Sequence, residues 1–252
     1  MPSPIVILTG ASRGLGLAVL QLLLKHNARV TALSRSLPDD LRALQSQYAD
    51  QLLIVQGDVS KPEDNVSAVK QTVHKWGGID SLILNAGSIE PARIADIDLS
   101  TAPQYVSANL LSTLYITQPA LPYLRKSNGR VVLVSSGASS RGYTSWGLYS
   151  AVKAGMNSVA RTLANEEKNL SVWSIRPGVV DTPMQELLRG LKGGVMDAEE
   201  HVKFTQLHES GQLLDAKLPG GVLAGLAFDG PKELSGEYLD WADQRLSAYK
   251  LE

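Results

Sequence analysis

Short apolar runs alternate with longer amphipathic segments along the whole chain. Apolar residues recur at helical spacing in two stripes, formed by Leu15, Val19, Leu22 and Leu23 and by Val66, Val69 and Val73. The runs predicted as strands are rich in β-branched residues and lie at 5–8, 30–33, 52–55, 81–84, 131–134 and 172–175. This alternation predicts parallel strands joined by right-handed helical crossovers. We therefore expect an α/β fold, a Rossmann-type doubly wound parallel sheet of about seven strands with helices on both faces.

No Pro/Gly-rich linker, repeat or low-complexity tract divides the chain, so we expect one domain over residues 1–252. The least regular stretch runs from about 182 to 215 and contains Gly190, Gly193 and Gly194. It interrupts the alternation at the carboxyl end of the sixth strand, where α/β sheets bind their ligands. We predict that this stretch is a substrate lid, and the alternative is a surface excursion without function.

Composition narrows the classes of function. The 252 residues are 44% hydrophobic, enough for a large core. With 24 basic and 25 acidic residues, the net charge of −1 provides no field for binding nucleic acid or an anionic membrane. The absence of cysteine excludes disulfides and thiolate chemistry. The N-terminal apolar run is too short for a signal peptide or membrane span. We expect a cytoplasmic enzyme with a small-molecule substrate.

A glycine-rich turn follows the first predicted strand and opens the first predicted helix. Glycines here let the backbone turn tightly and approach a pyrophosphate, and the helix N-terminus supplies free amide groups. The spacing G-x-x-x-G-x-G differs from the dinucleotide fingerprint G-x-G-x-x-G, so packing of a helix on a strand stays an alternative. The predicted cofactor contacts in this turn are Gly10, Ser12, Arg13, Gly14, Leu15 and Gly16.

The end of the second strand favours a particular dinucleotide. An acid at this point suits the ribose 2′-hydroxyl of NAD, whereas an arginine suits the 2′-phosphate of NADP. The segment 32–36 contains no acid and carries Arg35, and Arg13 is expected to converge on the same volume. The sequence therefore predicts NADPH, although two solvated loop arginines are the alternative. Asp39 and Asp40 lie farther on and are expected to start the second helix.

A candidate catalytic group follows the fifth strand. Tyr149 and Lys153 are spaced at i and i+4, so they lie one helical turn apart on one face. An ammonium and an oxidised nicotinamide nearby would lower the pKa of the phenol and improve it as a general acid. Ser136, at the end of the strand, would donate a hydrogen bond to the developing alkoxide. The Tyr-x-x-x-Lys spacing alone is weak evidence for a catalytic site, and it becomes stronger only together with the other motifs of the chain.

These features together resemble the short-chain dehydrogenase/reductase family over nearly the whole chain. The resemblance is carried by T-G-x-x-x-G-x-G at 9–16, N-A-G at 85–87 and the interval from Ser136 to Tyr149. It implies that Asn109 orders a water relay to Lys153, and it implies a homo-oligomer, a dimer or tetramer. Other roles stay open for Asn109, which can kink or cap a helix, and for Ser136, which can end a strand. The further cofactor contacts that it implies are Asp58, Val59, Asn85, Ala86, Gly87, Tyr149, Lys153, Pro177, Gly178, Val180 and Thr182.

The substrate is less well defined by the sequence. Glu90, Tyr143, Trp146 and Met184 are expected to wall the pocket, and such walls suit an aromatic carbonyl. The alternative is that Trp146 only packs in a core. Segments 144–147, 163–167, 180–185, 212–215 and 236–239 are similar to fungal benzil reductases, and through them to sepiapterin reductases. That resemblance implies reduction of vicinal diketones or related aromatic ketones.

No metal site is predicted, because the four histidines lie on separate segments without ligand spacing. The leading hypothesis is an NADPH-dependent carbonyl reductase with Tyr149 as general acid. One alternative is an NAD-dependent alcohol dehydrogenase of the same fold, and another is a non-catalytic NADP-binding sensor.

Overall fold

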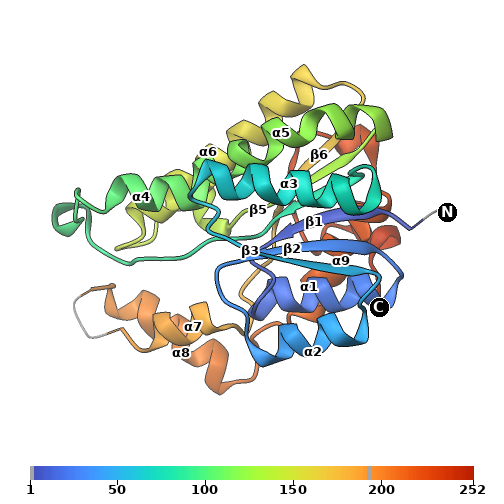
Figure 1. Cartoon of the computed structure of the whole chain (residues 1–252). Helices are drawn as coiled ribbons and strands as arrows, with labels where there is room; N and C mark the ends of the chain where they lie inside the picture. Colours follow the sequence, from blue (N-terminus) through green and yellow to red (C-terminus); the bar gives the residue numbers. More distant parts are fainter. Residues whose placement is uncertain (1–2, 192–194) are drawn as a thin grey trace.

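One parallel sheet runs through the middle of the protein (Figure 1). The computed structural model describes residues 3–191 and 195–252. The sheet has seven strands in the order β3-β2-β1-β4-β5-β6-β7, so the strand order reverses between β1 and β4. The strands are β1 (Ile5–Thr9), β2 (Arg29–Ser34), β3 (Leu52–Gln56), β4 (Ser81–Leu84), β5 (Arg130–Val134), β6 (Ser171–Arg176) and β7 (Tyr238–Asp240). Ligands of such sheets bind beyond the carboxyl ends of the strands, near this reversal.

Helices cover both faces of the sheet (Figure 1). One layer contains α1 (Gly14–Lys25), α2 (Asp39–Gln47) and α9 (Lys217–Phe228), and the other contains α3 (Pro62–Trp76), α5 (Ser112–Ser127) and α6 (Gly147–Glu166). The remaining helical segments are η1 (Ile94–Asp96), α4 (Ala102–Val106), the π-helical turn η2 (Ser107–Leu111), η3 (Gly137–Ser139), α7 (Pro183–Arg189), α8 (Ala198–Glu209), η4 (Lys232–Leu234) and η5 (Gln244–Tyr249). The expected α/β doubly wound fold is therefore confirmed.

The core follows from the two-sided burial of the strands. Side chains alternate between the faces, so Val6 and Leu8 join α1 and α9 in one apolar cluster, while Ile7 joins the α3 side. All five residues of β1 are buried. Parallel strands covered on both faces read as continuous apolar runs, which is why the sequence located six of them. The seventh strand, β7, has only three residues and was not located.

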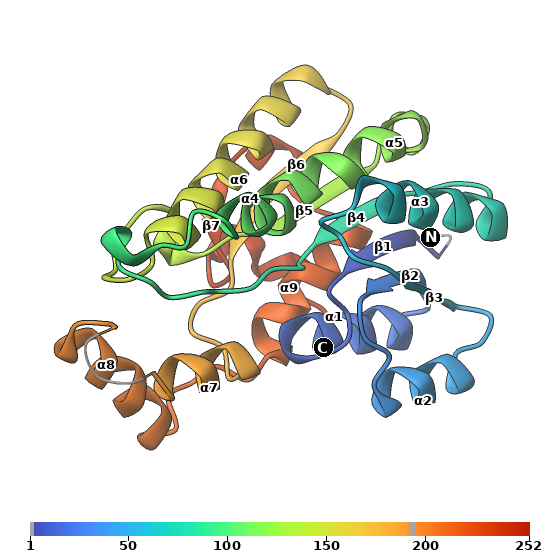
Figure 2. The same ribbon diagram turned by 60° about the vertical axis from the view of Figure 1, so that its left-hand side comes forward.

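The stretch 182–215 is more regular than its sequence suggested. Where the structure describes it, the chain forms α7 and α8, and its function as a substrate lid stays a prediction. Gly193 and Gly194 lie outside the described residues. Figure 2 shows α7 and α8 standing apart from the sheet, beyond its carboxyl edge. The pair is placed where a cover over a site would have to lie. In the described part of the chain, no helix is long and apolar enough to cross a membrane.

Candidate active site

Ser136, Tyr149 and Lys153 come together at the carboxyl end of β5. Ser136 leaves the strand in extended conformation and caps η3, its Oγ accepting a 3.2 Å hydrogen bond from the Ala138 amide. Tyr149 and Lys153 lie in the first turns of α6 and are 7% and 4% exposed. The Lys153 ammonium lies 5.8 Å from the centre of the Tyr149 ring and donates a 2.7 Å hydrogen bond to the Val134 carbonyl. The sequence spacing thus produces one buried polar cluster.

Burial has the largest effect on the electrostatics of this cluster. Burial raises the pKa of the Tyr149 phenol, a hydrogen bond with the Ser136 side chain opposes this, and the nearby Tyr238 adds to it. Burial also lowers the pKa of Lys153 to about 8. The lowering of the pKa of Tyr149 by Lys153 together with an oxidised nicotinamide stays a prediction, because in the protein alone burial is the largest effect on the phenol. Near neutral pH Tyr149 holds its proton, as an acid must.

Asn109 and Gly87 lie against Lys153. Asn109 is buried in the π-helical turn η2; its Oδ1 accepts a 2.8 Å bond from the Ser88 amide and its Nδ2 donates to Tyr105. A Cβ on Gly87 would lie 3.1 Å from Asn109 Oδ1 and 3.7 Å from Lys153 Nζ, so these two polar atoms face the same point. π-helical turns occur often at functional sites. Asn109 thus lies in an irregular turn of its helix, with its side-chain oxygen on the same side of Gly87 as Lys153 Nζ.

The glycine-rich turn is closely packed and ends at an open helix N-terminus. A Cβ on Gly16 would lie 2.1 Å from the Gly10 carbonyl oxygen, and Gly10 itself has φ +72°. Asn85 is hydrogen-bonded to the turn: its side-chain amide donates 3.1 Å bonds to the carbonyls of Thr9 and Gly10. No side chain caps the N-terminus of α1 at Arg13. The uncapped amides and positive helix end therefore fit a pyrophosphate.

Arg13 and Arg35 are both exposed beside this turn. Their loops touch, because the Ser36 and Ser12 hydroxyls are 3.4 Å apart. Within residues 3–191 and 195–252 neither arginine makes a salt bridge closer than 4.0 Å. Arg35 is nevertheless near Asp58. Burial acts to raise the pKa of Asp58, but hydrogen bonds from Ser60 and the positive charge of Arg35 lower it overall.

The segment after β6 closes the other side of the turn. Gly178 has φ +77°, and a Cβ there would meet Leu214 at 2.6 Å. Val180 pairs with Leu214 in an isolated parallel bridge. Thr182 then lies against the glycine turn, its Cγ2 being 3.2 Å from the Cβ position of Gly14. The predicted contacts on either side of the dinucleotide are thus brought together although they are far apart in sequence.

Aromatic side chains cover the Tyr149 side of the site. The Trp146 ring lies edge-on to Tyr149 with centroids 5.7 Å apart and is stacked on Phe204 of α8 at 5.5 Å. Tyr143 packs on Trp146 at 4.8 Å, and Met184 packs on the same cluster. Trp146 is buried, so it is a core residue of this cluster and a direct neighbour of Tyr149 at once.

Polar contacts tie α8 to the loop that carries Trp146. The Glu200 carboxylate accepts hydrogen bonds from both the amide and the hydroxyl of Thr144, and the Asp197 amide donates to that hydroxyl at 2.9 Å. Arg93 forms a 2.7 Å ion pair with Asp197. Glu90, which was also predicted to line the substrate pocket, is exposed. The α7–α8 pair is therefore fastened over the aromatic cluster.

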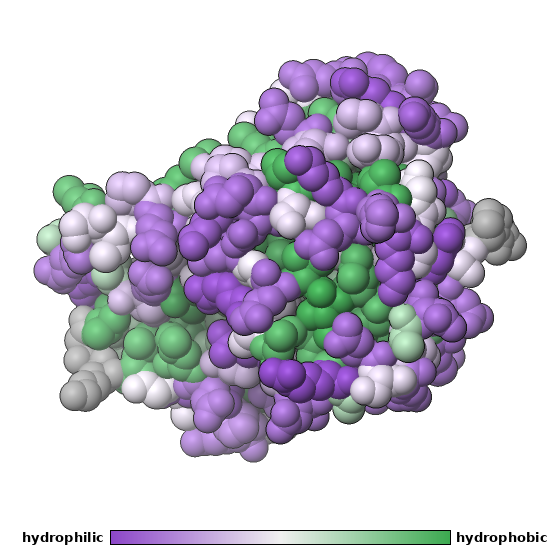
Figure 3. Space-filling model, in the orientation of Figure 1, coloured by the Kyte–Doolittle hydropathy of each residue, from purple (hydrophilic) through white to green (hydrophobic). Residues whose placement is uncertain are grey.

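Apolar side chains are exposed among polar ones at this end of the protein. Figure 3 shows apolar surface between α4 and the α7–α8 pair. The exposed large apolar side chains on these elements include Ile94 and Leu99 before α4, Leu187 on α7 and Val202 on α8. An apolar rim beside an aromatic cluster suits an apolar ligand.

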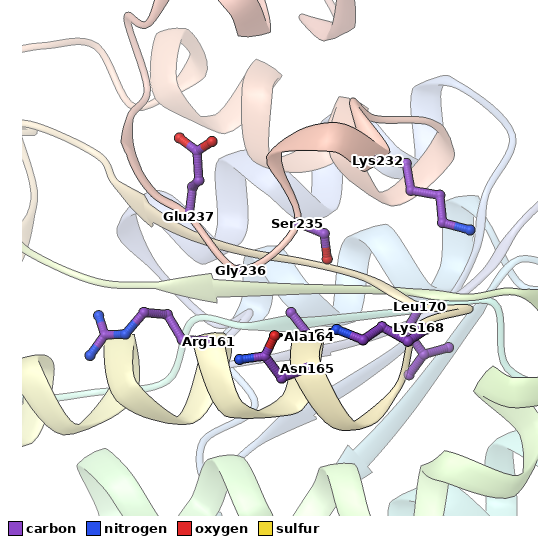
Figure 4. Close-up of a pocket in the computed structure, with 9 residues that line it drawn as sticks. All are labelled: Arg161, Ala164, Asn165, Lys168, Leu170, Lys232, Ser235, Gly236 and Glu237. Carbon is purple, nitrogen blue, oxygen red and sulfur yellow. Dashed lines mark hydrogen bonds between the residues drawn. The ribbon is translucent and has the colours of Figure 1, made fainter.

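A separate pocket of about 400 Å³ lies away from these residues, beside the amino end of β6 (Figure 4). It is lined by residues of α6, of the α6–β6 loop, of η4 and of the loop before β7, among them Arg161, Lys168 and Lys232. It belongs to the opposite end of the sheet from Tyr149 and is not part of the candidate site. No group of three or more potential metal ligands occurs among the described residues.

Comparison with known proteins decides the family. Residues 4–190 match the short chain dehydrogenase family. The chain belongs to the short-chain dehydrogenase/reductase family. It is 38% identical to an uncharacterized oxidoreductase of Schizosaccharomyces pombe, over 94% of this chain and 96% of that one. It is 34% identical to a benzil reductase ((S)-benzoin forming) of Saccharomyces cerevisiae, over 96% and 97%. The crystal structure of a short-chain dehydrogenase/reductase from Saccharomyces cerevisiae, 36% identical, superposes with a TM-score of 0.95 over 98% and 100%.

Three residues near Tyr149 were not found from the sequence. Phe204 and Tyr238 lie far from Tyr149 along the chain. Tyr105 is close enough to be affected by Tyr149, because burial, followed by the charges of Tyr149 and Glu90, raises the pKa of Tyr105. Isolated aromatic residues in helices and short strands carry no motif. Only the benzil reductase-like segment 236–239 drew attention to the region of Tyr238.

Proposed function

We propose that this short-chain dehydrogenase/reductase is an NADPH-dependent carbonyl reductase that acts on aromatic ketones, vicinal diketones such as benzil in particular. The observation that carries the proposal is the buried, protonated Tyr149 held between Ser136 and the aromatic cluster. A phenol that keeps its proton near neutral pH has that proton to donate to a carbonyl oxygen, which is the direction of reduction. The name of the yeast benzil reductase supports the substrate class.

Each side chain has a defined task in this reaction. Tyr149 Oη transfers its proton to the ketone oxygen, and the Ser136 hydroxyl donates a hydrogen bond to that oxygen as negative charge develops on it. Lys153, with a pKa of about 8, returns a proton to Tyr149 through a water held by Asn109. When bound, NADPH supplies the hydride that reaches the carbonyl carbon. The products are the alcohol and the oxidised cofactor.

The cofactor would lie along the turn from Gly10 to Gly16 and against the segment from Pro177 to Thr182. Preference for NADPH rests on Arg13 and Arg35, since exposed guanidinium groups on touching loops bind a 2′-phosphate bidentately. The aromatic cluster under α7 and α8 would exclude water from the reacting carbonyl. We further propose that the protein works in the cytoplasm as a homo-oligomer.

The test of the activity is NADPH consumption with benzil and related ketones, comparing wild type with Tyr149→Phe. We expect kcat to fall by about 100- to 10,000-fold, because the variant keeps the ring and loses the acid. Tyr48→Phe, on the distant end of α2, is the matched control and should keep wild-type activity. Tight NADPH binding without turnover of any carbonyl by wild type would favour the sensor hypothesis.

The cofactor preference is tested separately with Arg35→Ala. We expect the Kd for NADPH to rise about 10-fold or more and the Kd for NADH to stay constant, since a charge-assisted contact contributes about 1.5–3 kcal/mol. Arg161→Ala, which removes an exposed arginine from the remote pocket of Figure 4, should change neither constant. An unchanged NADPH affinity in Arg35→Ala, with NAD bound better than NADP, would support the NAD-dependent alternative.

A further inference from the structure

The backbone carbonyl of Ser136 is held by two side-chain donors. The Tyr238 hydroxyl, from β7, donates a 2.8 Å hydrogen bond to it, and the Ser139 hydroxyl donates a second of 2.7 Å. The Ser139 amide also donates to this oxygen at 3.0 Å, so the carbonyl accepts from one backbone donor and two side-chain donors. Ser136 follows the end of β5, one residue after the Ser135 amide, which still donates to the Ile175 carbonyl of β6 at 2.9 Å.

A buried polar chain continues from this point into α6. The Asn157 side chain donates 2.9 Å to Ser139 Oγ, and its carbonyl oxygen accepts 2.6 Å from the Ser174 hydroxyl. Asn157 and Ser174 are 6% and 1% exposed. Asn157 is four residues after Lys153 on the same helix, so it faces the same side as Lys153 and Tyr149. Four hydrogen bonds thus run without interruption from β7 through Ser136 to α6 and β6.

Each hydroxyl or amide donor in this chain of hydrogen bonds has one acceptor, and the donor and acceptor roles of its members are compatible. The chain is half-buried at Ser136, Ser139 and Tyr238 and buried at Asn157 and Ser174. Connected hydrogen-bond networks fix a local geometry, whereas removal of a member leaves its partner unpaired. The β6–β7 end is braced further by an ion pair between Arg176 and Asp240, which lie opposite each other in the strand register. A Cβ on Gly137, next to Ser136, would lie 3.3 Å from the Arg176 side chain.

We propose that Tyr238 and Ser139 are positioning residues of the reductase, which set the Ser136 hydroxyl against Tyr149 by holding the Ser136 carbonyl. The inference rests on the proposed function for its kinetic consequence. It predicts that a hydroxyl on the last strand of the sheet controls the rate of the chemical step without touching the substrate.

The kinetic test uses Tyr238→Phe, which keeps the ring and the strand. In single-turnover reduction of benzil we expect the rate of the chemical step to fall about 10-fold, because small misplacements of a catalytic group have large effects on rate. The Kd for NADPH and the Kd for benzil should change less than about twofold. Tyr249→Phe, a half-buried tyrosine of η5, is the control for loss of a phenol hydroxyl elsewhere. Ser139→Ala should behave like Tyr238→Phe, whereas the exposed neighbour Ser140→Ala should not.

A double-mutant cycle separates positioning from general stability. If Tyr238 acts through Ser136, its hydroxyl has nothing left to position in Ser136→Ala, and adding Tyr238→Phe to that variant should change the rate less than about twofold. A full additional loss of rate in the Ser136→Ala background would overturn the proposal.

Amide hydrogen exchange provides a reading that needs no turnover. The Ala138 amide donates to Ser136 Oγ, so it reports where that hydroxyl lies. In Tyr238→Phe we expect this amide to exchange about 5- to 10-fold faster, with amides of β1 unchanged. Unchanged exchange at Ala138 would overturn the inference even in an active enzyme. A wild type without reductase activity, but with the expected exchange, would refute the proposed function alone.

Discussion

A buried lysine that loses its charge near pH 8 makes stability depend on pH in a defined way. Lys153 is 4% exposed and has a single backbone acceptor within 3 Å, the Val134 carbonyl. Its pKa is lowered from 10.5 to about 8. The unfolded chain holds the proton up to about pH 10.5, whereas the folded chain releases it near pH 8. Between these limits the unfolded state binds more protons, so stability rises with pH.

The size of the effect follows from the two pKa values. The difference between 10.5 and about 8, at about 1.4 kcal/mol per pH unit, corresponds to about 3 kcal/mol against folding when Lys153 is charged. At about pH 7 nearly all of this cost is present, and at about pH 9.5 about 1 kcal/mol of it remains. Over that range the wild-type protein should gain about 2 kcal/mol relative to Lys153→Met, which has no charge to bury.

The assay is equilibrium urea unfolding of both proteins without cofactor, at several pH values between about 7 and 9.5. Taking the difference between the two proteins removes the contribution of every other titrating group, provided that it does not interact with Lys153. The hydrogen bond to Val134 that Lys153→Met loses shifts the difference by a constant. A difference that stays within about 0.5 kcal/mol over the whole range would show that Lys153 keeps an ordinary pKa in the folded protein.

Two further substitutions test the packing of the site, each against a matched control. Gly16→Ala places a Cβ 2.1 Å from a carbonyl oxygen of the same turn, so we expect a loss of about 1–3 kcal/mol in the free energy of unfolding and weaker NADPH binding. Gly78→Ala, with open space around it, should leave both the stability, measured by calorimetry, and the NADPH affinity, measured by fluorescence titration, unchanged. Phe204→Ala removes the ring stacked on Trp146, so we expect the KM for benzil to rise about 10-fold and unfolding to be easier by about 3 kcal/mol. Val202→Ala, half exposed on the same helix, should stay within about 0.5 kcal/mol of wild type, and equal effects of the two changes would contradict the role of the stack.

Much of the fold was predictable because two-sided burial leaves a plain pattern. Strands such as β1 and β5 are apolar almost throughout, and the glycines at their ends mark the turns. α2 begins at Asp39 and Asp40, as expected of acids in a first helical turn. The strand β7 was not predicted, because three residues are too few to show an alternation of polar and apolar side chains. The helices α7 and α8 were not predicted, because glycines interrupt this stretch of the sequence and few of the helices' residues are buried.

The candidate site was predictable only where a local motif carries it. Tyr149 and Lys153 are one turn apart, so sequence spacing places them on one helix face. The burial that raises the pKa of the Tyr149 phenol could not be predicted, because the sequence shows the neighbouring ammonium but not the packing around the ring. The contacts of Tyr238 with Ser136 and of Phe204 with Trp146 join residues far apart in the chain. Such contacts depend on the tertiary fold.

The central claim is that Tyr149 and NADPH together reduce a ketone, and one measurement tests it directly. Benzil is incubated with the enzyme and NADPH that carries deuterium at the transferable position of the nicotinamide, and the product is analysed by mass spectrometry. The account predicts a hydroxyketone with one deuterium on the new carbinol carbon from wild type, and almost none from Tyr149→Phe. Tight binding of NADPH with no labelled alcohol from any carbonyl in the panel, or equal labelling by both proteins, would contradict it.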